Sequence, residues 1–312
     1  MSERPSKPPK PRSTADAQVR MEIEGGQHAR CGVWWNAPPT YATHRVGRIG
    51  EFEADNERVA AIVLERACGQ LAAQGCTLAV GPMDGSTWHS YRFVTERGSE
   101  PAFFLEPHNP DEWPSYFRAA GFEPLAHYTS ALDRGLEIRD PKAPEIEQGL
   151  ALRGVRIRPL DLQRFEAEMR AIHRVSLASF ARNFLYSPIG EEEFVAMYAP
   201  LRELIDPSIV YIAEHDSAVA GFVFGLPDLL RPQHGLPADT MIVKTLARDP
   251  HELYAGLGGV LLERCRSAAH ERGYTRCIHA LMYDENASVD LSERFGATMR
   301  GYTLFAKELA GA

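Results

Sequence analysis

Three glycines, Gly256, Gly258 and Gly259, lie where a predicted strand over residues 241–247 gives way to a predicted helix over residues 255–273. Because glycine has no Cβ, backbone N–H groups in such a turn can approach an anion closely. The positive end of the helix dipole adds about 0.3–1 kcal/mol for each favourable charge. A diphosphate is the ligand that this arrangement favours, and close packing of the helix against the strand is the alternative interpretation.

The segments around this turn predict a mixed α/β domain. Hydrophobic periodicity gives the order β-α-α-β-β-β-α-β-α-β. The strands are expected at 154–159, 209–214, 219–225, 241–247, 277–282 and 302–305, and the helices at 162–180, 194–205, 255–273 and 288–294. A dinucleotide-binding fold would need the pattern G-x-G-x-x-G and an acidic residue about 20 positions later. Neither that spacing nor that order of strands is present.

The first half of the chain repeats part of this order. A strand is predicted at 46–54, a helix at 59–74 and a strand at 76–80. The tripeptide Leu-Glu-Arg and the glycine that ends each helix recur at one common spacing, and AAGFEPLAHYTS (119–130) resembles RFGATMRGYTLF (294–305). We therefore expect a tandem pair of domains. The expected parts are a disordered tail at 1–17, a first domain at 18–134, a polar linker at 135–152 and a second domain at 153–312.

Composition limits the class of protein. The chain has 312 residues, of which 44% are hydrophobic and 24% charged, as is typical of a soluble protein with a packed core. A formal net charge of -8 argues against nucleic acid as the main partner, because phosphate backbones are held by clustered Lys and Arg. The five cysteines form no CxxC pair, which argues against a zinc site or a disulfide framework. The sequence has no signal peptide and no apolar run of membrane-spanning length, so we expect a cytoplasmic protein without a membrane partner. A homodimer is possible.

From Val155 to Lys307, the predicted element order resembles that of the GNAT (N-acetyltransferase) superfamily. The signature of that family is Gln or Arg, two residues, Gly, one residue, and then Gly or Ala; it falls on Leu253, Gly256 and Gly258. The resemblance implies an α/β fold with a mixed sheet. It further implies two tandem GNAT-like acyl-CoA N-acyltransferase domains, of which the first is truncated and degenerate.

Two further family positions lie downstream. The Asn that opens the next helix of the family falls on Asn286, and the usual Tyr-x-x-x-Gly-Phe falls on Ser292, Gly296 and Ala297. The chain departs from the family at two places. Leu253 stands where the family has a polar or basic residue, which puts the strength of phosphate binding in doubt. Ser292 stands where a tyrosine often serves as general acid toward the leaving thiolate, which puts catalysis itself in doubt.

The resemblance implies acetyl-CoA, or another acyl-CoA, as co-substrate and no metal. The acyl-CoA would lie in a V opened between the strands at 241–247 and 277–282. Main-chain groups of the first strand would pair with the pantetheine arm, and amides of the glycine turn would hold the diphosphate. The implied cofactor-binding residues are Thr245, Leu246, Arg248, Leu253, Ala255, Gly256, Leu257, Gly258, Gly259, Val260 and Asn286.

The expected reaction, direct attack of a substrate amine on the thioester in one ternary complex, requires a base. An amine with a pKa near 10.4 is neutral in only about one molecule in 2,500 at pH 7, so a base must take its proton, directly or through water. His279 also fits a hydrogen-bonded core histidine, and Asp284 and Glu285 also fit charges at a helix N-terminus. The candidate catalytic residues are Glu214, His279, Asp284 and Glu285 as bases, and Ser292 and Tyr283 as acids.

The first half keeps the helix but not the glycines. The recurring spacing places Arg58, Ala60 and Ala61 where the second half has its three glycines. We therefore expect that this half does not bind CoA and that it lacks the first strand and the early helices of the fold. Its loop 81–92 is rich in turn formers and in aromatic and polar side chains, a composition often found in ligand-binding loops. The candidate substrate-binding residues are Trp88, His89, Tyr91 and Arg92, and a structural Ω-loop is the alternative.

Three functions stay open at this point. The leading one is transfer of an acetyl or other acyl group from acyl-CoA to the amine of a small molecule. The first alternative is a catalytically degenerate CoA-binding or regulatory protein without turnover. The second is an interaction scaffold whose halves bury each other and that has no affinity for CoA. Lys244, in the strand before the glycine turn, would contact a substrate carboxylate or phosphate in the first case, or lie at a solvated strand edge.

Overall fold

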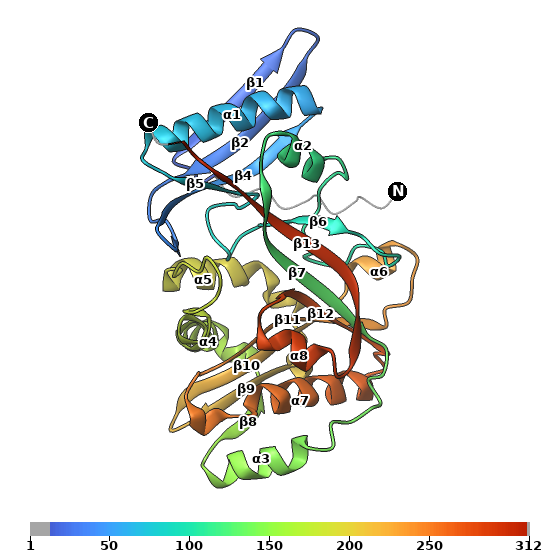
Figure 1. Cartoon of the computed structure of the whole chain (residues 1–312). Helices are drawn as coiled ribbons and strands as arrows, with labels where there is room; N and C mark the ends of the chain where they lie inside the picture. The colour runs from blue at the N-terminus through green and yellow to red at the C-terminus, as the bar shows by residue number, and fades with distance from the viewer. Residues whose placement is uncertain (1–12, 311–312) are drawn as a thin grey trace. The chain divides into compact units, whose positions relative to one another are not determined.

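The computed structural model describes residues 13–310 and divides the chain into two compact units (Figure 1). We call them the N-terminal unit, with residues up to 91, 112–123 and from 305 onward, and the C-terminal unit, with residues 92–111 and 124–304. The units are therefore not contiguous segments. Residues 92–111 and 124–134, which the sequence places in the first domain, pack in the C-terminal unit.

The N-terminal unit is a sheet covered by a long helix. Its strands follow the order β1 (Ala17–Ile23), β2 (Gln27–Trp34), β4 (His44–Ala54), β5 (Leu78–Gly81) and the end of β13 (Gly296–Glu308), with short β3 (Thr40–Tyr41) beside β4. Helix α1 (Glu57–Ala73) packs on β1, β2 and β4, and α2 (Trp113–Ala119) contacts α1 (Figure 1). The predicted strand, helix and strand are confirmed as β4, α1 and β5. The hairpin of β1 and β2 was not predicted.

The expected tail at 1–17 lies mostly outside the described residues, but its last part is ordered. Strand β1 begins at Ala17, and the Asp16 carboxylate accepts hydrogen bonds from the backbone N–H groups of Trp35 and Asn36 at 2.7 and 2.9 Å. The polar segment that predicts a disordered tail therefore includes residues that are already ordered and that help to position the first strand.

The C-terminal unit has the full predicted element order. Its sheet runs β13-β7-β12-β11-β10-β9-β8, with β6 (Phe93–Glu96) also paired to β13. The remaining strands are β7 (Glu123–Asp133), β8 (Arg156–Pro159), β9 (Val210–His215), β10 (Ala218–Pro227), β11 (Thr240–Arg248) and β12 (Arg276–Tyr283). The helices are α3 (Ala143–Leu152), α4 (Phe165–Phe180), α5 (Glu191–Tyr198), α6 (Leu230–Gln233), α7 (Leu257–Glu271) and α8 (Ala287–Ser292). From β8 to β13 the sequence-based order β-α-α-β-β-β-α-β-α-β is confirmed.

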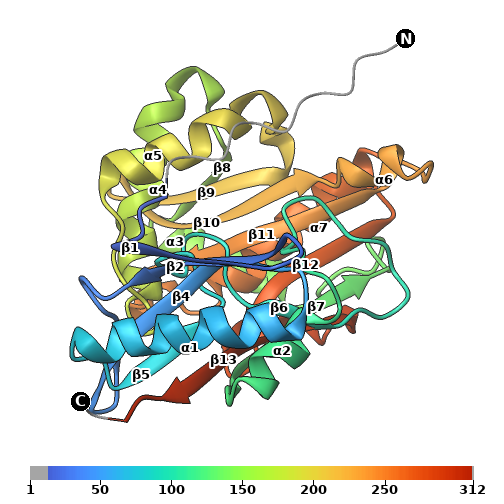
Figure 2. The same ribbon diagram turned by 90° about the horizontal axis from the view of Figure 1, so that it is seen from above.

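Helices cover both faces of this sheet. Because side chains alternate along a strand, Val223 of β10 packs into the core beneath α7, while its neighbour Phe224 contacts Tyr198 at the end of α5 with ring centroids 5.4 Å apart. Figures 1 and 2 show α4 and α5 on one face and α7 on the other. The cysteines, all of which lie within the described residues, are free and buried.

The two halves of the chain exchange their last strands. Strand β7, from the first half, pairs antiparallel with β12 of the second, with His279 opposite Ala131. In turn, the end of β13 pairs antiparallel with β5, with Phe305 opposite Gly81. These are the two segments, 119–130 and 294–305, whose sequences resemble each other. The exchange explains why compact units and contiguous halves do not coincide.

The expected linker at 135–152 is an integral part of the C-terminal unit. It contains α3, whose Leu150 lies with Leu136 in the core beneath α7. The polar composition of this segment reflects the outer face of an amphipathic helix. No helix among residues 13–310 combines the length and the hydropathy of a membrane-spanning helix.

Arg266 of α7 anchors that helix to the exchanged strand. Its fully buried guanidinium donates to Asp133 at 2.8 Å and to Glu263 at 2.9 Å, and it lies 3.7 Å from the ring centroid of Phe295. It also donates to the backbone carbonyl of Gly135 at 3.0 Å. A buried charge of this kind is tolerated because every partner is present.

We predict that Arg266→Ala destabilises the protein by about 3–5 kcal/mol, because Asp133 is left as an unpaired buried charge. Arg264→Ala is the matched control on the same helix: the Arg264 pair with Glu147 is 46% and 29% exposed, and such pairs contribute about 1 kcal/mol or less. Thermal unfolding of both variants measures the difference. Equal losses of stability would contradict the anchoring role of Arg266.

Candidate functional site

Strands β11 and β12 pair for a short distance and then diverge. The parallel ladder joins Thr240–Val243 to Arg276–His279 and goes no further, although β11 continues to Arg248 and β12 to Tyr283. Beyond the ladder, β11 stays paired with β10 and β12 with β7. The facing edges of the two strands therefore have no strand partner in this stretch, which we call the divergence. It is the V that the sequence analysis expects.

A bulge in each strand accompanies the divergence. Lys244 is the extra residue of β11, because Gly225 of β10 pairs with Val243 and Phe224 with Thr245. In β12, Leu281 has a φ of +59° where the register with β7 shifts. Bulges bend the strand that carries them. The splayed geometry is therefore set locally in both strands.

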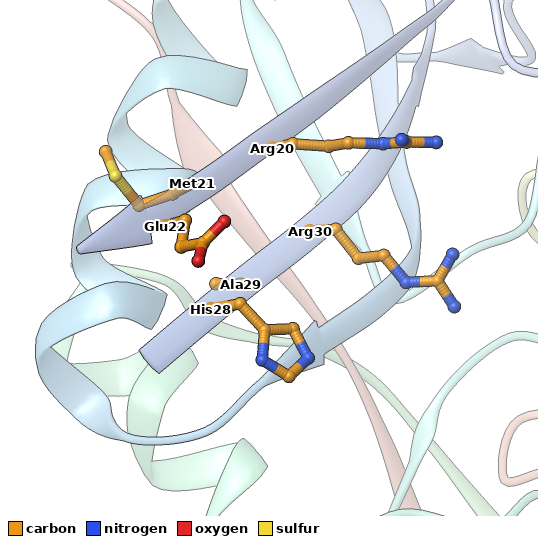
Figure 3. A pocket seen from close by; sticks show the side chains of 6 residues that line it. All are labelled: Arg20, Met21, Glu22, His28, Ala29 and Arg30. Atoms are coloured by element: carbon orange, nitrogen blue, oxygen red, sulfur yellow. The ribbon is translucent and has the colours of Figure 1, made fainter. Parts of the chain in front are cut away.

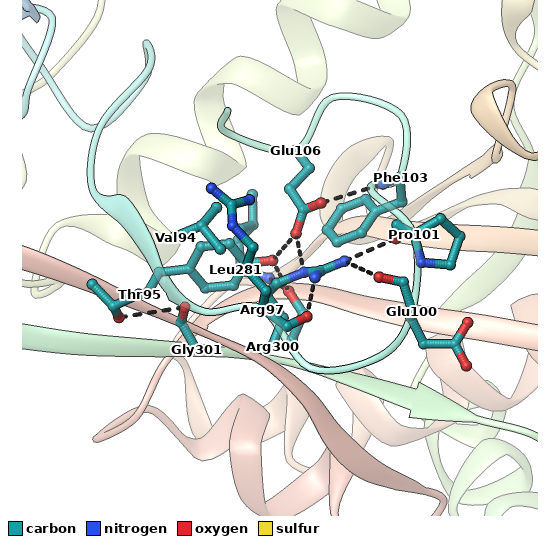
Figure 4. Close-up of polar contacts among 12 residues, drawn as sticks. Val94, Thr95, Arg97, Glu100, Pro101, Phe103, Glu106, Leu281, Arg300 and Gly301 are labelled. Carbon is teal, nitrogen blue, oxygen red and sulfur yellow. Dashed lines mark hydrogen bonds and ion pairs between the residues drawn. The ribbon is translucent and has the colours of Figure 1, made fainter. Parts of the chain in front are cut away.

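A buried hydrogen-bond network holds the bulge of β12 (Figure 4). The backbone N–H of Leu281 donates to the hydroxyl of Ser130, which lies 3.0 Å from that of Tyr302. The Tyr302 hydroxyl donates to Glu106 at 2.6 Å, and Arg300 donates to the same carboxylate oxygen at 2.8 Å. Burial and the Glu106 charge raise the pKa of Tyr302 far above its usual range, so it stays a donor. The network connects β12, β7 and β13 to the loop that contains Glu106, between β6 and α2.

The start of α7 is open. Gly256 is the N-cap residue with a φ of +82°, and no side chain caps the helix. The first ladder bond runs from the Val260 N–H to the Gly256 carbonyl at 3.2 Å. Within residues 13–310, no hydrogen bond is formed by the amides of Leu257, Gly258 and Gly259, which are the orphan donors of a helix end.

The three glycines have different roles. A Cβ on Gly256 would lie 2.7 Å from Cγ2 of Ile146, and its φ also requires glycine. A Cβ on Gly258 or Gly259 would meet nothing nearer than 3.9 Å. Close packing therefore explains Gly256 but not Gly258 or Gly259, whose missing side chains leave space in front of free amides. This space and these donors fit a diphosphate.

The other expected cofactor residues lie around the same place. Thr245, Leu246 and Arg248 form the part of β11 that borders the divergence. Asn286 is the N-cap of α8, yet its side chain makes no cap hydrogen bond. The amides of Ala255 and Val260 are already used within the chain, and Leu253 lies against the core beneath α7. The available anion donors are thus the amides of residues 257–259.

His279 and Ser292, predicted separately, form a buried pair. The Nδ1 atom of His279 lies 2.7 Å from the Ser292 hydroxyl, and the two residues are 4% and 2% exposed. Burial lowers the pKa of His279 to about 4, so the ring is neutral at neutral pH. Its Nε2 atom has no hydrogen-bond partner among the described residues. The geometry suits a core histidine better than a solvent-connected base.

The carboxylate candidates are separated. Glu214 lies on β9, where Arg158 donates to it at 2.6 Å. That hydrogen bond lowers the pKa of Glu214, which weakens it as a base, and β10 separates β9 from β11. Asp284 and Glu285 are exposed in the turn that follows β12, at the end of the divergence. Of the three carboxylates, the last two border the expected acyl-CoA site.

The boundary between the two units falls within the loop 81–92. Trp88, His89 and Tyr91 belong to the N-terminal unit, and the His89 ring lies 3.1 Å from the Ser86 hydroxyl. Arg92 belongs to the C-terminal unit and is 6% exposed. The expected substrate-binding set thus includes residues of both units, and its role stays a prediction.

An aromatic residue that the sequence analysis does not single out, Tyr128, lies beside Arg92. Its guanidinium lies 4.3 Å from the ring centroid of Tyr128. Tyr283 lies between Tyr128 and Phe184, with centroid distances of 5.3 and 5.4 Å. Tyr128 comes from the exchanged strand β7, and no local pattern could connect it with Tyr283.

A shallow hollow on the β1–β2 hairpin lies outside these residues (Figure 3). It is lined by Arg20, Met21, Glu22, His28, Ala29 and Arg30. Arg30 is paired with Glu53 at 2.6 Å, and His28 with Asp55 at 2.8 Å. None of the predicted site residues lines this hollow. No cluster of metal-ligating side chains occurs in the described part of the chain.

We predict that His279 reduces stability in acid. Its pKa of about 4 in the folded protein is below the value of about 6.5 in the unfolded chain. The unfolded chain therefore binds the proton first, and the loss between pH 6.5 and 4 amounts to about 3 kcal/mol at most. His279→Gln should show a smaller fall in melting temperature over this range than the wild type. His108→Gln, at an exposed position, is the control, and unchanged acid sensitivity of His279→Gln would refute the assignment.

Comparison with known proteins begins with sequence. No family model matches the chain. It is 24% identical over 184 residues to protein YghO of Escherichia coli, covering 59% of this chain and 47% of that protein. It is 25% identical over 185 residues to a bacterial ceramide synthase of Caulobacter vibrioides, covering 59% and 48%. The chain thus spans about half the length of the curated relatives that it matches.

Solved structures resemble nearly the whole chain. A GCN5-related N-acetyltransferase from Sphaerobacter thermophilus superposes with a TM-score of 0.52 at 12% identity, covering 91% of this chain and 78% of that one. A tandem GNAT protein from the clavulanic acid biosynthesis pathway gives 0.50 at 13% identity, covering 96% and 86%. With the observed order of elements, these likenesses show that the chain has the GNAT fold in a tandem arrangement.

Proposed function

We propose that the C-terminal unit transfers an acyl group from acyl-CoA, with acetyl-CoA as the simplest donor, to the amine of a small molecule. The amine attacks directly in a ternary complex. The observation that carries this proposal is the open start of α7, with three unpaired amides beside the divergence of β11 and β12. When bound, acyl-CoA supplies an activated thioester.

The electrostatics of α7 support a diphosphate at its start. Acidic side chains are favoured in the first turn of a helix because they complement its dipole. The first turn of α7 has none, and its N-cap residue Gly256 has no side chain to accept from the amides. The positive end of the helix is therefore left uncompensated by the protein. An anionic ligand there would gain both the dipole and the three donors.

The equivalent helix of the N-terminal unit is closed. The Asn56 side chain accepts a hydrogen bond from the Val59 N–H at 3.2 Å, and Glu57 places a carboxylate in the first turn of α1. Arg58 and Ala60 stand in place of two of the glycines. The protein itself thus caps one amide of this helix start and complements its dipole, and we assign acyl-CoA binding to the C-terminal unit alone.

The remaining candidates divide into roles. Thr245, Leu246 and Arg248 offer the main-chain edge of β11 to a pantetheine arm, and Asn286 offers its uncommitted side-chain amide. Asp284 or Glu285, exposed at the end of the divergence, takes the proton of the acceptor ammonium directly or through water.

The leaving thiolate of CoA also needs a proton donor. Tyr283 lies at the end of β12 and carries a hydroxyl. The Ser292 hydroxyl is the other candidate, held by His279.

Calorimetry and a thiol-release assay on the full chain test the proposal. We expect CoA to bind, and free thiol to appear when an acyl-CoA and an amine are both present. The donor panel runs from acetyl-CoA to long-chain acyl-CoA, because one matched relative is named a ceramide synthase. CoA binding without thiol release for any amine would favour the regulatory alternative. Absence of CoA binding would overturn the proposal.

We predict that Gly258→Asp weakens CoA binding without destabilising the protein. A carboxylate in the first turn favours the helix dipole, so the melting temperature should stay the same or rise. The same carboxylate repels a diphosphate and competes for its amides, so CoA affinity should fall by about 10- to 100-fold, the equivalent of about 1.4–2.8 kcal/mol.

Gly69→Asp, on the exposed side of α1, is the matched control. A Cβ at Gly69 would meet nothing within 4 Å, so the substitution adds the same carboxylate without a steric clash. It should leave CoA affinity unchanged. Unaltered affinity in Gly258→Asp would show that this turn does not hold the diphosphate.

A further inference from the structure

Helix α4 crosses one face of the sheet in the C-terminal unit (Figure 2). Near its start, Glu168 accepts a hydrogen bond from Arg158 of β8 at 2.9 Å. Just past its end, the ring of Phe184 stacks on that of Tyr283 in β12, with centroids 5.4 Å apart. Strands β9, β10 and β11 lie between β8 and β12 in the sheet. The chain has therefore passed over the divergence of β11 and β12 by the time it reaches Phe184.

Helix α5 returns over the sheet and ends at β11. The ring of Tyr198, the last residue of α5, lies 5.4 Å from the ring of Phe224 in β10. Phe224 is directly opposite Thr245 of β11, so both side chains are on the face that α5 covers. In agreement, burial raises the pKa of Tyr198, and a hydrogen bond with the Thr245 side chain lowers it in part. Tyr198 thus stands over β11 just beyond the bulge at Lys244.

The segment 184–198, which we call the cover, is held in place from within the unit. The Nε2 atom of His173 lies 2.9 Å from the carbonyl oxygen of Ile189, and its ring lies 5.3 Å from that of Phe194. Leu185 is 3% exposed and has a φ of +52°, a costly conformation for a large side chain that often occurs at functional positions. The cover is therefore a fixed part of this face, and it extends from β12 to β11.

The cover lies at the end of the path that the proposed donor would take. The free amides of residues 257–259 follow the C-terminal end of β11, and α7 lies on the other face of the sheet (Figure 2). From Arg248, the free edge of β11 leads back to Thr245, about 10 Å at about 3.3 Å per residue. An acyl-pantetheine chain that follows this edge brings its acyl group to Thr245. Tyr198 stands over that position.

We propose that the ring of Tyr198 limits the length of the acyl group, so that the donor is acetyl-CoA or an acyl-CoA with a similarly short chain. This inference rests on the proposed acyl transfer and specifies its donor. The ring is held between Phe194 and Phe224, with centroids 4.9 and 5.4 Å away. Because close-packed side chains resist displacement, a longer acyl chain meets a closed end. Tyr198 determines specificity here and transfers no proton.

Calorimetry on the full chain, without an amine, measures how acyl length affects affinity. We expect hexanoyl-CoA to bind at least about tenfold more weakly than acetyl-CoA. Tyr198→Ala should remove this difference because it opens the end of the path, and Tyr198→Leu should reduce it in part. Tyr198→Phe keeps the ring and should behave as the wild type does. Equal affinities of the wild type for both donors, or an unchanged ratio in Tyr198→Ala, would overturn the proposal.

Tyr116→Ala is the matched control. Tyr116 is half-buried on α2 of the N-terminal unit, so the variant loses the same side chain away from the divergence. It should leave the ratio of the two affinities unchanged. Thermal melting must show that each Tyr198 variant is folded at the assay temperature. Tyr198→Leu keeps apolar contacts with the neighbouring rings and carries the test if Tyr198→Ala does not fold.

Turnover separates this inference from the proposed function. With an amine that the thiol-release assay identifies, Tyr198→Ala should raise the ratio of kcat/KM for hexanoyl-CoA to that for acetyl-CoA at least about tenfold. CoA binding without any effect of Tyr198 on acyl length would refute the inference and leave acyl transfer intact. Absence of CoA binding would refute acyl transfer itself.

Discussion

The candidate site depends on the early end of the ladder between β11 and β12. A strand inside a sheet normally has both edges paired, because unpaired backbone groups are costly when buried. Here β11 stays paired with β10 and β12 with β7 beyond the end of their common ladder, so each strand keeps one neighbour while the two facing edges stay apart. The backbone edges of both strands, the free amides of α7 and the bulge at Lys244 all border this one interruption. The groups that could bind a ligand are those that the sheet leaves unpaired.

The exchanged strand β7 makes the first half of the chain indispensable to that interruption. Ser130 of β7 accepts the hydrogen bond that holds the bulge at Leu281, and Asp133 receives the buried charge of Arg266 from α7. Tyr128 of the same strand contributes to the wall beside Arg92. A segment that begins at residue 153 would lack all three. The last strand of the first half thus forms part of the sheet that contains the divergence.

Local patterns predicted most of the elements, because each depends on residues close in sequence. The helix expected at 255–273 is α7, and Gly273, with a φ of +88°, ends it as predicted. The glycine turn was identified from composition alone. The pair of His279 with Ser292 was not predicted as a contact, although both residues were singled out. Sequence spacing does not say which residues of a strand and a later helix share one face.

Long-range pairing explains the remaining differences. The linker prediction missed α3, because its inward residues Ile146 and Leu150 are separated by polar ones and become apolar contacts only against α7. The predicted domain boundary at residue 134 missed the strand exchange. Local sequence patterns do not say whether β7 and β13 pair with the sheet of their own half or with that of the other half. Arg92 was expected in one substrate-binding set with Trp88, His89 and Tyr91, and the contact with Tyr128 that the exchange adds was not predicted. These features depend on how distant strands pair in the folded protein, which local sequence patterns do not determine.

The starts of α1 and α7 differ in what complements their amides and dipole. In α1, Asn56 accepts from the Val59 N–H and Glu57 complements the dipole from within the chain, which stabilises the helix. In α7, Gly256 provides neither, so the same donors stay available. A cap is worth about 1 kcal/mol to a helix, and α7 has none at the place where its amides lie beside the divergence. Its first turn also carries no carboxylate, so neither the amides nor the dipole is complemented from within the chain there.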